Sequence, residues 1–321
     1  MVYIVALIVV IAVAGLVVLA QRADKAGKLL KLRYQRTGTQ IEIDGGTLNM
    51  LDLGPPQIGG PPLVLIHDSG ANHNDLKISI GERLARDSRV IIVDRPGSGW
   101  SDQLNSASGS SPEDQAVAIA QGLEKLGARN PVVIGHGTGA AVALAFALSY
   151  PEDLAGLILV APVAFPGEAK PEWLQRLAAL PLVGPALASI TAPVLGPILQ
   201  PRQHEDAFSP QSVPDGFSEN TAAPLRFRTT CFVGEARDLT ELDKSLAEQS
   251  RFYREIRVPT VLISADQDQI ANSQTQADRL ARDIPDMRHV VLNGAGHMAH
   301  HISPNVIEFE INRLAERMWR D

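Results

Sequence analysis

Short, uniformly apolar runs alternate with helical stretches along most of this sequence, and that alternation restricts the possible fold more than any other feature. Apolar residues on both faces of a run predict strands buried on both sides, as in a parallel sheet. The βαβα order predicts a doubly wound, mostly parallel α/β sheet. The strand-like runs are "PPLVLIHD" (61–68), "RVIIVDRPGSGWSD" (89–102), "PVVIGH" (131–136), "LAGLILVAP" (154–162), "VPTVLISAD" (258–266) and "RHVVLNG" (288–294). The helical stretches are 114–127, 138–150, 273–284 and 303–319.

A hairpin is expected ahead of this sheet. The stretch "TQIEIDGGTLNMLDLG" alternates apolar and polar residues around Gly45 and Gly46, which is typical of two antiparallel strands joined by a tight turn. Ligands of doubly wound sheets bind outside the carboxyl ends of the strands. The polar and glycine clusters that follow the apolar runs are therefore where a site is expected.

Residues 163–256 interrupt the alternation. This segment is rich in proline and carries short apolar helices such as "WLQRLAALPLVGPALASI" (173–190). An insertion of this length between two core strands predicts a helical lid over the site. Its apolar residues either pack on the main domain or line an entry path for a lipophilic substrate. The predicted core is then 38–162 together with 257–321.

The first twenty residues differ from the rest of the chain. Residues 2–20 carry no charge, and at helical rise they span close to the hydrocarbon thickness of a bilayer. We expect residues 1–21 to form a transmembrane anchor. A buried core helix and a cleaved signal peptide are the alternatives; Val18 and Ala20 suit a cleavage site, but no Lys or Arg precedes the apolar run.

Basic residues follow the apolar run within a predicted juxtamembrane stalk, residues 22–37. By the positive-inside rule this flank stays cytoplasmic, which predicts a single-pass protein of the inner membrane with its folded domain in the cytoplasm. The same cluster could lie on anionic headgroups, at about 1 kcal/mol per residue. The basic residues are Arg22, Lys25, Lys28, Lys31, Arg33 and Arg36.

Composition excludes several other classes of protein. The formal charge of −7, without a basic stripe in the main body, argues against nucleic acid as a partner. Cys231 is the single cysteine, so an intrachain disulfide is impossible, and we expect this residue in the core. The turn "GHGTGA" has neither the Lys-Ser/Thr of a phosphate-binding loop nor a dinucleotide fingerprint, so no cofactor is implied.

Four motifs in order, each at the end of a predicted strand, carry a family resemblance over about residues 38–320. "DRPGSGWSD" (94–102) looks like a family turn, and "GHGTG" (135–139) has the form of a nucleophile elbow with small residues at both ends. "SADQDQI" (264–270) resembles the segment that carries the acid, and "NGAGHMAHH" (293–301) the segment that carries the base. The chain thus resembles the α/β-hydrolase fold superfamily.

The resemblance implies a base at His297 and an acid at Asp268 that fixes the tautomer of the base. Asp266 is the alternative acid. His300 and His301 have no role in the motif and are expected to face solvent or the lid. Together with His297 they could suggest a metal site, but no carboxylate or cysteine stands at ligand spacing, so we expect no metal.

Gly137 stands where the resemblance implies a nucleophilic serine. Glycine offers no side chain there, so a covalent acyl-enzyme at the elbow is excluded. Moving the nucleophile to Thr138 does not help, because His136 and Ala140 would then occupy the crowded positions and histidine is too large.

A second departure lies in "LIHDSGANHND" (65–75). The family usually has His-Gly here, close to the oxyanion hole, whereas this chain has Asp68 followed by Ser69. Together with Thr138 these residues define the expected oxyanion-hole region. A carboxylate beside a developing oxyanion would oppose it, and two independent changes indicate a natural departure from acyl transfer.

Three functions remain open on this sequence. His297 could activate a water held in the space beside Gly137, with a small lipophilic ester or amide as substrate; Asp68 could also serve there as a relocated base or nucleophile. The chain could instead be an inactive pseudo-hydrolase that binds a lipophilic ligand or an unidentified protein partner. Finally, Gly137 could be an introduced replacement for a serine.

Overall fold

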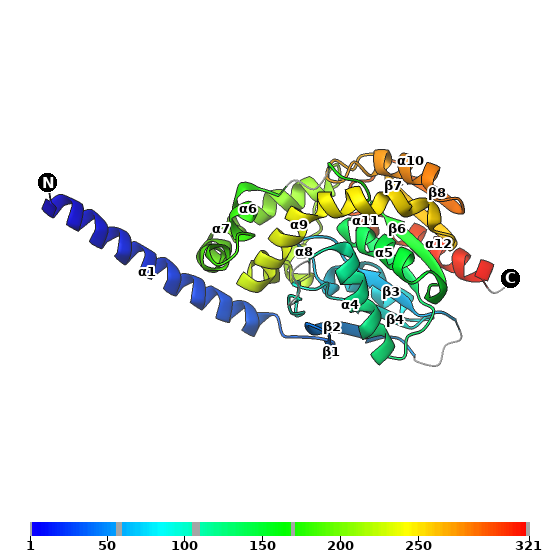
Figure 1. The fold of residues 1–321 in the computed structure, drawn as a ribbon, viewed down its shortest axis with the longest axis horizontal. Coiled ribbons are helices and arrows are strands. Elements are labelled where there is room, and N and C mark those ends of the chain that lie inside the picture. The colour runs from blue at the N-terminus through cyan, green and yellow to red at the C-terminus, as the bar shows by residue number, and fades with distance from the viewer. Residues whose placement is uncertain (1, 56–59, 105–109, 168–170, 319–321) are drawn as a thin grey trace.

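The computed structural model describes residues 2–55, 60–104, 110–167 and 171–318; within the first and last helices, the side chains of residues 2, 4–14, 16, 315, 317 and 318 lie outside this description. Among the described residues, eight strands form one sheet in the order β1-β2-β4-β3-β5-β6-β7-β8 (Figure 1). Their bounds are β1 Thr39–Ile43, β2 Gly46–Leu53, β3 Leu63–Ile66, β4 Val90–Val93, β5 Val132–His136, β6 Gly156–Val160, β7 Thr260–Ala265 and β8 Met287–Leu292.

The predicted sheet type is confirmed. β1 and β2 form an antiparallel hairpin whose turn contains Gly45 with φ of 90°, a conformation that favours glycine. β2 pairs antiparallel with β4, and the remaining pairs, from β4 to β8, are parallel. All residues of β3, β4, β5, β6 and β7 are buried, as their continuous apolar sequences predict.

Helices cover both faces of the sheet. Side chains alternate between the faces along each strand, so Val64 and Ile66 enter one apolar cluster with α4, α5 and α10, whereas Leu63 and Leu65 enter the opposite cluster with η1, α11 and α12. The helices of the core are α2 His73–Leu76, η1 Lys77–Gly81, α3 Glu82–Leu84, α4 Pro112–Lys125, α5 Thr138–Ser149, η2 Pro151–Asp153, α10 Ser273–Asp283, α11 Ala299–Ile302 and α12 Pro304–Met318.

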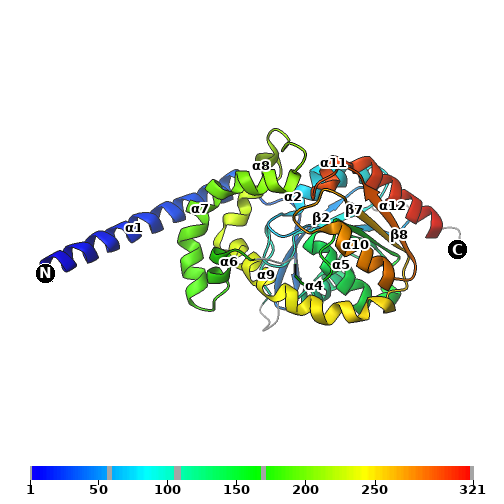
Figure 2. The ribbon, with the colours of Figure 1, turned by 90° about the horizontal axis from the view of Figure 1, so that it is seen from above.

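Between β6 and β7 the chain leaves the sheet and forms a helical unit, which we call the cap (residues 171–255). Figures 1 and 2 show it beside the sheet, on the side where the N-terminal helix lies. Its helices are α6 Trp173–Ala178, α7 Val183–Phe208, α8 Phe217–Asn220, η3 Ala223–Phe227, α9 Thr229–Gln249 and η4 Ser250–Glu255. Cys231 lies buried within it, as expected of a core residue.

The N-terminal helix α1 runs without interruption from Val2 to Arg33 and packs against α7. The predicted anchor and most of the predicted stalk therefore belong to one helix. Most side chains of the predicted span, residues 2–20, lie outside the described residues, and the span remains a prediction. Among the described residues, α7 is the helix with the length and composition of a membrane span.

Candidate active site

Four turns at the carboxyl ends of parallel strands bring the predicted site residues together. Asp68 follows β3, Gly137 follows β5, Asp268 follows β7 and His297 follows β8. The four positions are separated by up to 229 residues in sequence, yet direct contacts connect them. Parallel pairing of β3, β5, β6, β7 and β8 places these strand ends along one edge of the sheet.

The turn after β5 has the geometry of a nucleophile elbow. Gly137 has φ of 56° and ψ of −121°, and its amide donates to the carbonyl of Val160 on the neighbouring strand. The flanking glycines are required by space: a Cβ at Gly135 would lie 2.5 Å from the Gly139 oxygen, and one at Gly139 would lie 2.4 Å from the Ile66 oxygen. The backbone thus retains the strained turn even though the elbow residue has no side chain.

The predicted acid and base form a pair. His297 Nδ1 lies 3.0 Å from Asp268 Oδ2, and the other oxygen of Asp268 accepts the amides of Ile270 and Ala271 at 2.9 and 3.1 Å. Asp266, the alternative acid, instead accepts the amide of Gly294 at 2.6 Å. The geometry therefore places Asp268, rather than Asp266, behind His297.

The Asp68 carboxylate occupies the space that a side chain at position 137 would need. A Cβ added to Gly137 would lie 2.2 Å from Asp68 Oδ1. That oxygen accepts the amide of Thr138 at 2.6 Å, and Oδ2 lies 3.1 Å from His297 Nε2. The expectation that Gly137 leaves room for a water is wrong, because the carboxylate fills that room.

The two departures from the family pattern are consequently one change. A side chain at 137 would collide with the Asp68 carboxylate where it now lies, so a serine there and this position of the carboxylate exclude each other. The amide of Thr138, which belongs to the expected oxyanion-hole region, donates to Asp68 itself. Ser69 also lines this region, and its buried hydroxyl has no hydrogen-bond partner among the described residues.

The two carboxylates determine the charge of the histidine between them. Burial alone would lower the pKa of His297, but Asp268 and then Asp68 together raise this pKa to about 10. Burial likewise opposes ionisation of Asp68, yet His297 holds the pKa of that carboxyl well below its usual range. The resting site is a carboxylate–imidazolium–carboxylate triad, so His297 is not a general base in the free protein near neutral pH.

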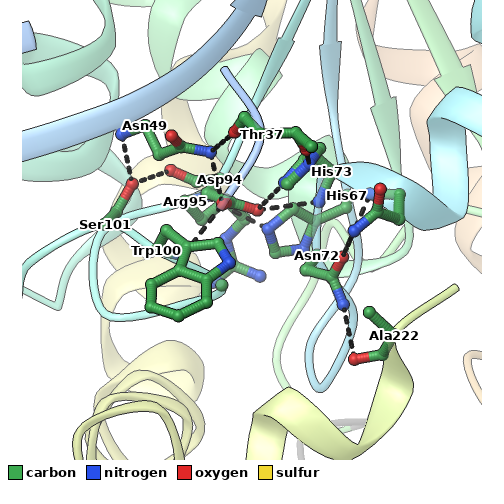
Figure 3. A network of polar contacts seen from close by, with 12 residues as sticks. Thr37, Asn49, His67, Asn72, His73, Asp94, Arg95, Trp100, Ser101 and Ala222 are labelled. Carbon is green, nitrogen blue, oxygen red and sulfur yellow. Dashed lines mark hydrogen bonds and ion pairs between the residues drawn. The ribbon is translucent and has the colours of Figure 1, made fainter. Parts of the chain in front are cut away.

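A network of buried polar residues fixes the turn that carries Asp68 (Figure 3). His67 Nε2 accepts the amide of Arg95 at 3.1 Å, and Asp94 accepts the amide of His73 at 2.7 Å. Asn72 Nδ2 donates to the carbonyl of Ala222 in the cap at 3.3 Å. Hydrogen bonds on both sides of Asp68 therefore hold its backbone in place and connect it to the cap.

A cavity of about 200 Å³ opens beside this triad. Asp68 and His297 line it from the core, whereas Phe208, Phe217 and Arg226 line it from the cap. The Asp68 side chain is 18% exposed and that of Asp268 is 0% exposed, so the cavity reaches the first carboxylate and not the second. A small, mostly apolar ligand would meet a carboxylate on the core side and a guanidinium on the cap side.

The expectation that His300 and His301 face solvent or the lid is wrong for His300, which is fully buried. His300 Nε2 and His301 Nε2 lie 3.0 and 2.7 Å from the two oxygens of Asp75. His301 also packs against Phe208 and Phe217 of the cap. A carboxylate does therefore approach these histidines, from a position more than 200 residues away, where sequence spacing gives no signal.

Two groups of side chains offer metal-ligand atoms within 4.8 Å of one another: Asp75 with His300 and His301, and Asp68 with His136 and His297. Hydrogen bonds account for most of these atoms, although His136 Nδ1 is buried without a partner among the described residues. His136 Nε2 donates to the carbonyl of His297 at 3.0 Å. Metal binding at His300 Nε2 would move its proton to Nδ1, which has no acceptor among the described residues. The donor sets thus fit a hydrogen-bonded structure better than a metal centre.

The geometry agrees with the comparisons to known proteins. The sequence model of the α/β hydrolase fold matches residues 61–304. Lipase 1 of Psychrobacter immobilis is 25% identical over 276 residues, covering 83% of this chain and 82% of that protein. Human monoacylglycerol lipase ABHD6 is 26% identical over 250 residues, 74% of this chain and 70% of its own.

Solved structures agree on the fold. A putative lipase from Acinetobacter baumannii superposes with a TM-score of 0.66 at 19% identity, covering 95% of this chain and 96% of its own. An esterase from Thermogutta terrifontis gives 0.68 at 22%, with 88% and 99% covered. The chain belongs to the α/β-hydrolase fold family. The two relatives compared by sequence are named as a lipase and a monoacylglycerol lipase.

Proposed function

We propose that this protein is a membrane-anchored hydrolase of small lipophilic compounds in which the Asp68 carboxylate replaces the serine as nucleophile. The observation that carries this proposal is the position of Asp68, which fills the space of the missing side chain and contacts both the Thr138 amide and His297. The anchor is residues 2–20, and the positive flank that follows favours a cytoplasmic domain at the inner membrane.

A carboxylate in this position differs chemically from a serine. It is ionised already, so it needs no base before it attacks. It also occupies the Thr138 amide, which leaves that donor unable to stabilise an oxyanion on the substrate. Attack on an acyl carbon needs such a donor, whereas displacement at an alkyl carbon does not. We therefore favour an alkyl substrate whose leaving group departs as an anion, over the esters and amides implied by the resemblance.

The first step would convert Asp68 into an alkyl ester. Asp68 Oδ2 forms a bond to the alkyl carbon, and the bond from that carbon to the leaving group breaks with its electron pair. The anion departs away from Asp68, toward the cap, where the guanidinium of Arg226, which is ion-paired with Glu235, lines the cavity wall. Esterification removes one of the two negative charges that raise the pKa of His297, so His297 can release its proton.

The second step would then use His297 as a base. Water attacks Cγ of the Asp68 ester and gives a proton to His297, while the negative charge that develops on Oδ1 is stabilised by the Thr138 amide. Collapse releases the alcohol with that proton, and the acid proton of Asp68 returns to His297. The sum is alkyl compound plus water giving alcohol, leaving anion and one proton, with the triad restored.

Oxygen labelling tests this proposal directly. In a single turnover in H₂¹⁸O with protein in excess, a short bromoalkane should give unlabelled alcohol, and the peptide containing Asp68 should gain the label. Direct attack of water on the substrate would instead label the alcohol, which would overturn the covalent mechanism. The Asp68→Asn variant is the matched control, because it keeps the shape and an acceptor for Thr138 but should lose turnover by about 10³-fold or more.

A binding protein would behave differently in the same assay. It would turn over neither bromoalkanes nor p-nitrophenyl esters, yet a lipophilic ligand would raise its melting temperature. That outcome would favour a pseudo-hydrolase in which Asp68 fills the site without acting as a nucleophile.

A further inference from the structure

The outer face of the cap is unusually apolar for a surface exposed to water. Leu182 is 93% exposed, Ile198 is 71% exposed and Trp173 is 67% exposed. Further exposed apolar side chains connect these three along α6 and α7. They are Leu177, Leu180, Val183, Leu187, Leu195 and Leu199.

This apolar face lacks the charges that a water-exposed helix normally carries. From Leu177 to Pro201 the sequence contains no Asp, Glu, Lys or Arg. The cap helix α9 offers the comparison: it has a buried apolar face and a polar, charged outer face. The composition of α7 therefore reflects what surrounds its outer side rather than a general property of the cap.

One side of α7 is held by the protein, so this helix cannot cross a membrane by itself. Small side chains spaced four residues apart are buried against the rest of the cap: Gly184, Ala188, Ala192 and Gly196. Phe227 shows how close this contact is, since a Cβ at Gly196 would lie 2.1 Å from its ring. Three prolines also lie inside the helix, where each removes a backbone hydrogen bond. α7 thus presents one face to the cap and the other face outward.

The N-terminal helix places this face at the level of a bilayer surface. The uncharged run of α1 ends at Ala20, and Ala20 and Ala23 border a crevice with Ser189, Ile190 and Pro193 of α7. Figures 1 and 2 show the first half of α7 crossing α1, at the edge of the cap nearest the N-terminal part of that helix. A bilayer that contained residues 2–20 would end where the cap begins.

We infer that the apolar face of α6 and α7 inserts into the surface of the lipid bilayer that holds α1. This inference rests on the anchor part of the proposed function and is independent of the chemistry at Asp68. The basic residues Lys28 and Lys31, which also border the crevice, lie where they can meet anionic headgroups. An amphipathic helix in this position buries its apolar side chains in the headgroup and acyl boundary. The occupant of the face is a lipid surface.

Site-directed fluorescence can test this docking with the full chain in vesicles of phosphatidylcholine and phosphatidylglycerol. The Leu182→Cys and Ile198→Cys variants carry an environment-sensitive label, and lipids with a doxyl group near the glycerol act as quencher. Cys231 does not compete, because burial raises the pKa of its thiol to about 11. We expect both labels to lose more than half of their fluorescence as the doxyl-lipid fraction rises.

Two control positions make the result decisive. A label at Arg282→Cys, on the exposed face of α10, should be unaffected by the quencher. A label at Val10→Cys reports insertion of α1. Quenching at Val10 without quenching at Leu182 and Ile198 would overturn the docking and leave the anchor standing. No quenching at Val10 would overturn the anchor and the docking together.

Self-association is the competing explanation for an apolar face. It would leave the two cap labels unquenched by lipid. It would also give disulfide cross-links between unlabelled copies of the Leu182→Cys variant, and their yield would increase with protein density. That outcome contradicts lipid docking and identifies a second copy of the chain as the occupant.

Discussion

Two buried clusters of carboxylates and histidines lie next to each other in this protein, and they behave in opposite ways. In the site triad, one histidine, His297, lies between two carboxylates, Asp68 and Asp268. In the second cluster, two histidines, His300 and His301, share the single carboxylate of Asp75. The same side-chain types are used, but the ratio of acid to base is reversed.

That ratio decides the charge of the buried imidazoles. Two carboxylates overcome the effect of burial and raise the pKa of His297 to about 10, so it is protonated. For His300 burial dominates over its single carboxylate, and its pKa is lowered. His136 lies between the two clusters, with its ring 4.7 Å from that of His297 and 4.2 Å from that of His300. Burial and these neighbours lower its pKa to about 3.

The comparison of the two clusters indicates a chemical role for one and a structural role for the other. Asp68 and Asp75 both line the cavity, but the Asp68 side chain is 18% exposed there, whereas that of Asp75 is 4% exposed and both its oxygens are taken by histidines that connect α2 to α11. We therefore assign reactivity to the first cluster and cohesion between these two helices to the second.

The largest expected effect comes from exchanging the two coupled residues of the site. Gly137→Ser alone places its side chain against Asp68, so we expect destabilisation of about 1–3 kcal/mol and little labelling by a serine-reactive phosphonate. In Asp68→Gly/Gly137→Ser, the serine has room, Thr138 is free as a donor, and His297 keeps only Asp268. We expect stoichiometric labelling and hydrolysis of short p-nitrophenyl esters.

Asp68→Gly without the serine is the control, and it should not be labelled. If Gly137→Ser alone reacts as fully as the double variant, the two positions are not coupled. If the folded double variant is inert, the acid–base pair is not arranged for acyl transfer.

The sequence predicts which turns carry the site residues better than it predicts the contacts among their side chains. The strand ends carrying Gly137, Asp268 and His297 follow from local motifs, because short turns after buried strands are specified by nearby residues. Asp68 stands out in the sequence as a departure, but its meaning depends on a distance to Gly137, which lies in another turn of the chain and which no local pattern encodes. A glycine and an acid that compensate for each other look independent until their atoms are placed.

The second cluster could not be predicted for the same reason. His300 and His301 carry no nearby carboxylate, and Asp75 lies in a different segment that joins them only when α2 and α11 pack together. The apolar lid is a different case, because its composition is evident in the sequence. Whether its apolar side chains face outward or pack on the core, however, is known only from their exposure in the structure.

A smaller effect, on stability alone, is expected from removing Asp75. Asp75→Ala leaves the Nε2–H donors of His300 and His301 without their acceptor, at about 1–3 kcal/mol for each buried donor. Chemical denaturation should show this loss, while the triad geometry and any single-turnover rate at Asp68 should stay within about threefold. Asp24→Ala, which breaks only an exposed contact with Lys28, is the matched control for removal of an acid and should change stability by less than about 0.5 kcal/mol. A rate loss in Asp75→Ala as large as that in Asp68→Asn would contradict the separation of roles.

The smallest effect per residue, and the most direct test of the charge assignment, is the pH dependence of folding. A lowered histidine pKa means that the unfolded chain binds more protons, so His136 and His300 should destabilise the fold as the pH falls below 6.5. A raised pKa has the opposite sign: the contribution of His297 is complete below 6.5 and is lost as the pH rises toward about 10. These three histidines together contribute most near pH 6.5, each with a slope of at most about 1.4 kcal/mol per pH unit, whereas Asp238, whose pKa burial raises to about 7, loses its contribution as the pH rises toward 7.

His297 contributes to the alkaline limb and the histidines with lowered pKa values contribute to the acid limb, so single variants can separate the two. Asp68→Asn leaves His297 with one carboxylate, lowers its pKa and should flatten the alkaline limb while the acid limb remains. His136→Gln, which retains a donor toward the His297 carbonyl, should reduce the slope of the acid limb while the alkaline limb remains. The rest of the acid limb comes from His300, His67 and His204, whose pKa values burial also lowers. Denaturant midpoints measured from about pH 4.5 to about pH 9.5 give both slopes. An alkaline limb that survives Asp68→Asn unchanged would mean that Asp268 alone holds the proton on His297, so that esterification of Asp68 would not free His297 to act as the base of the second step.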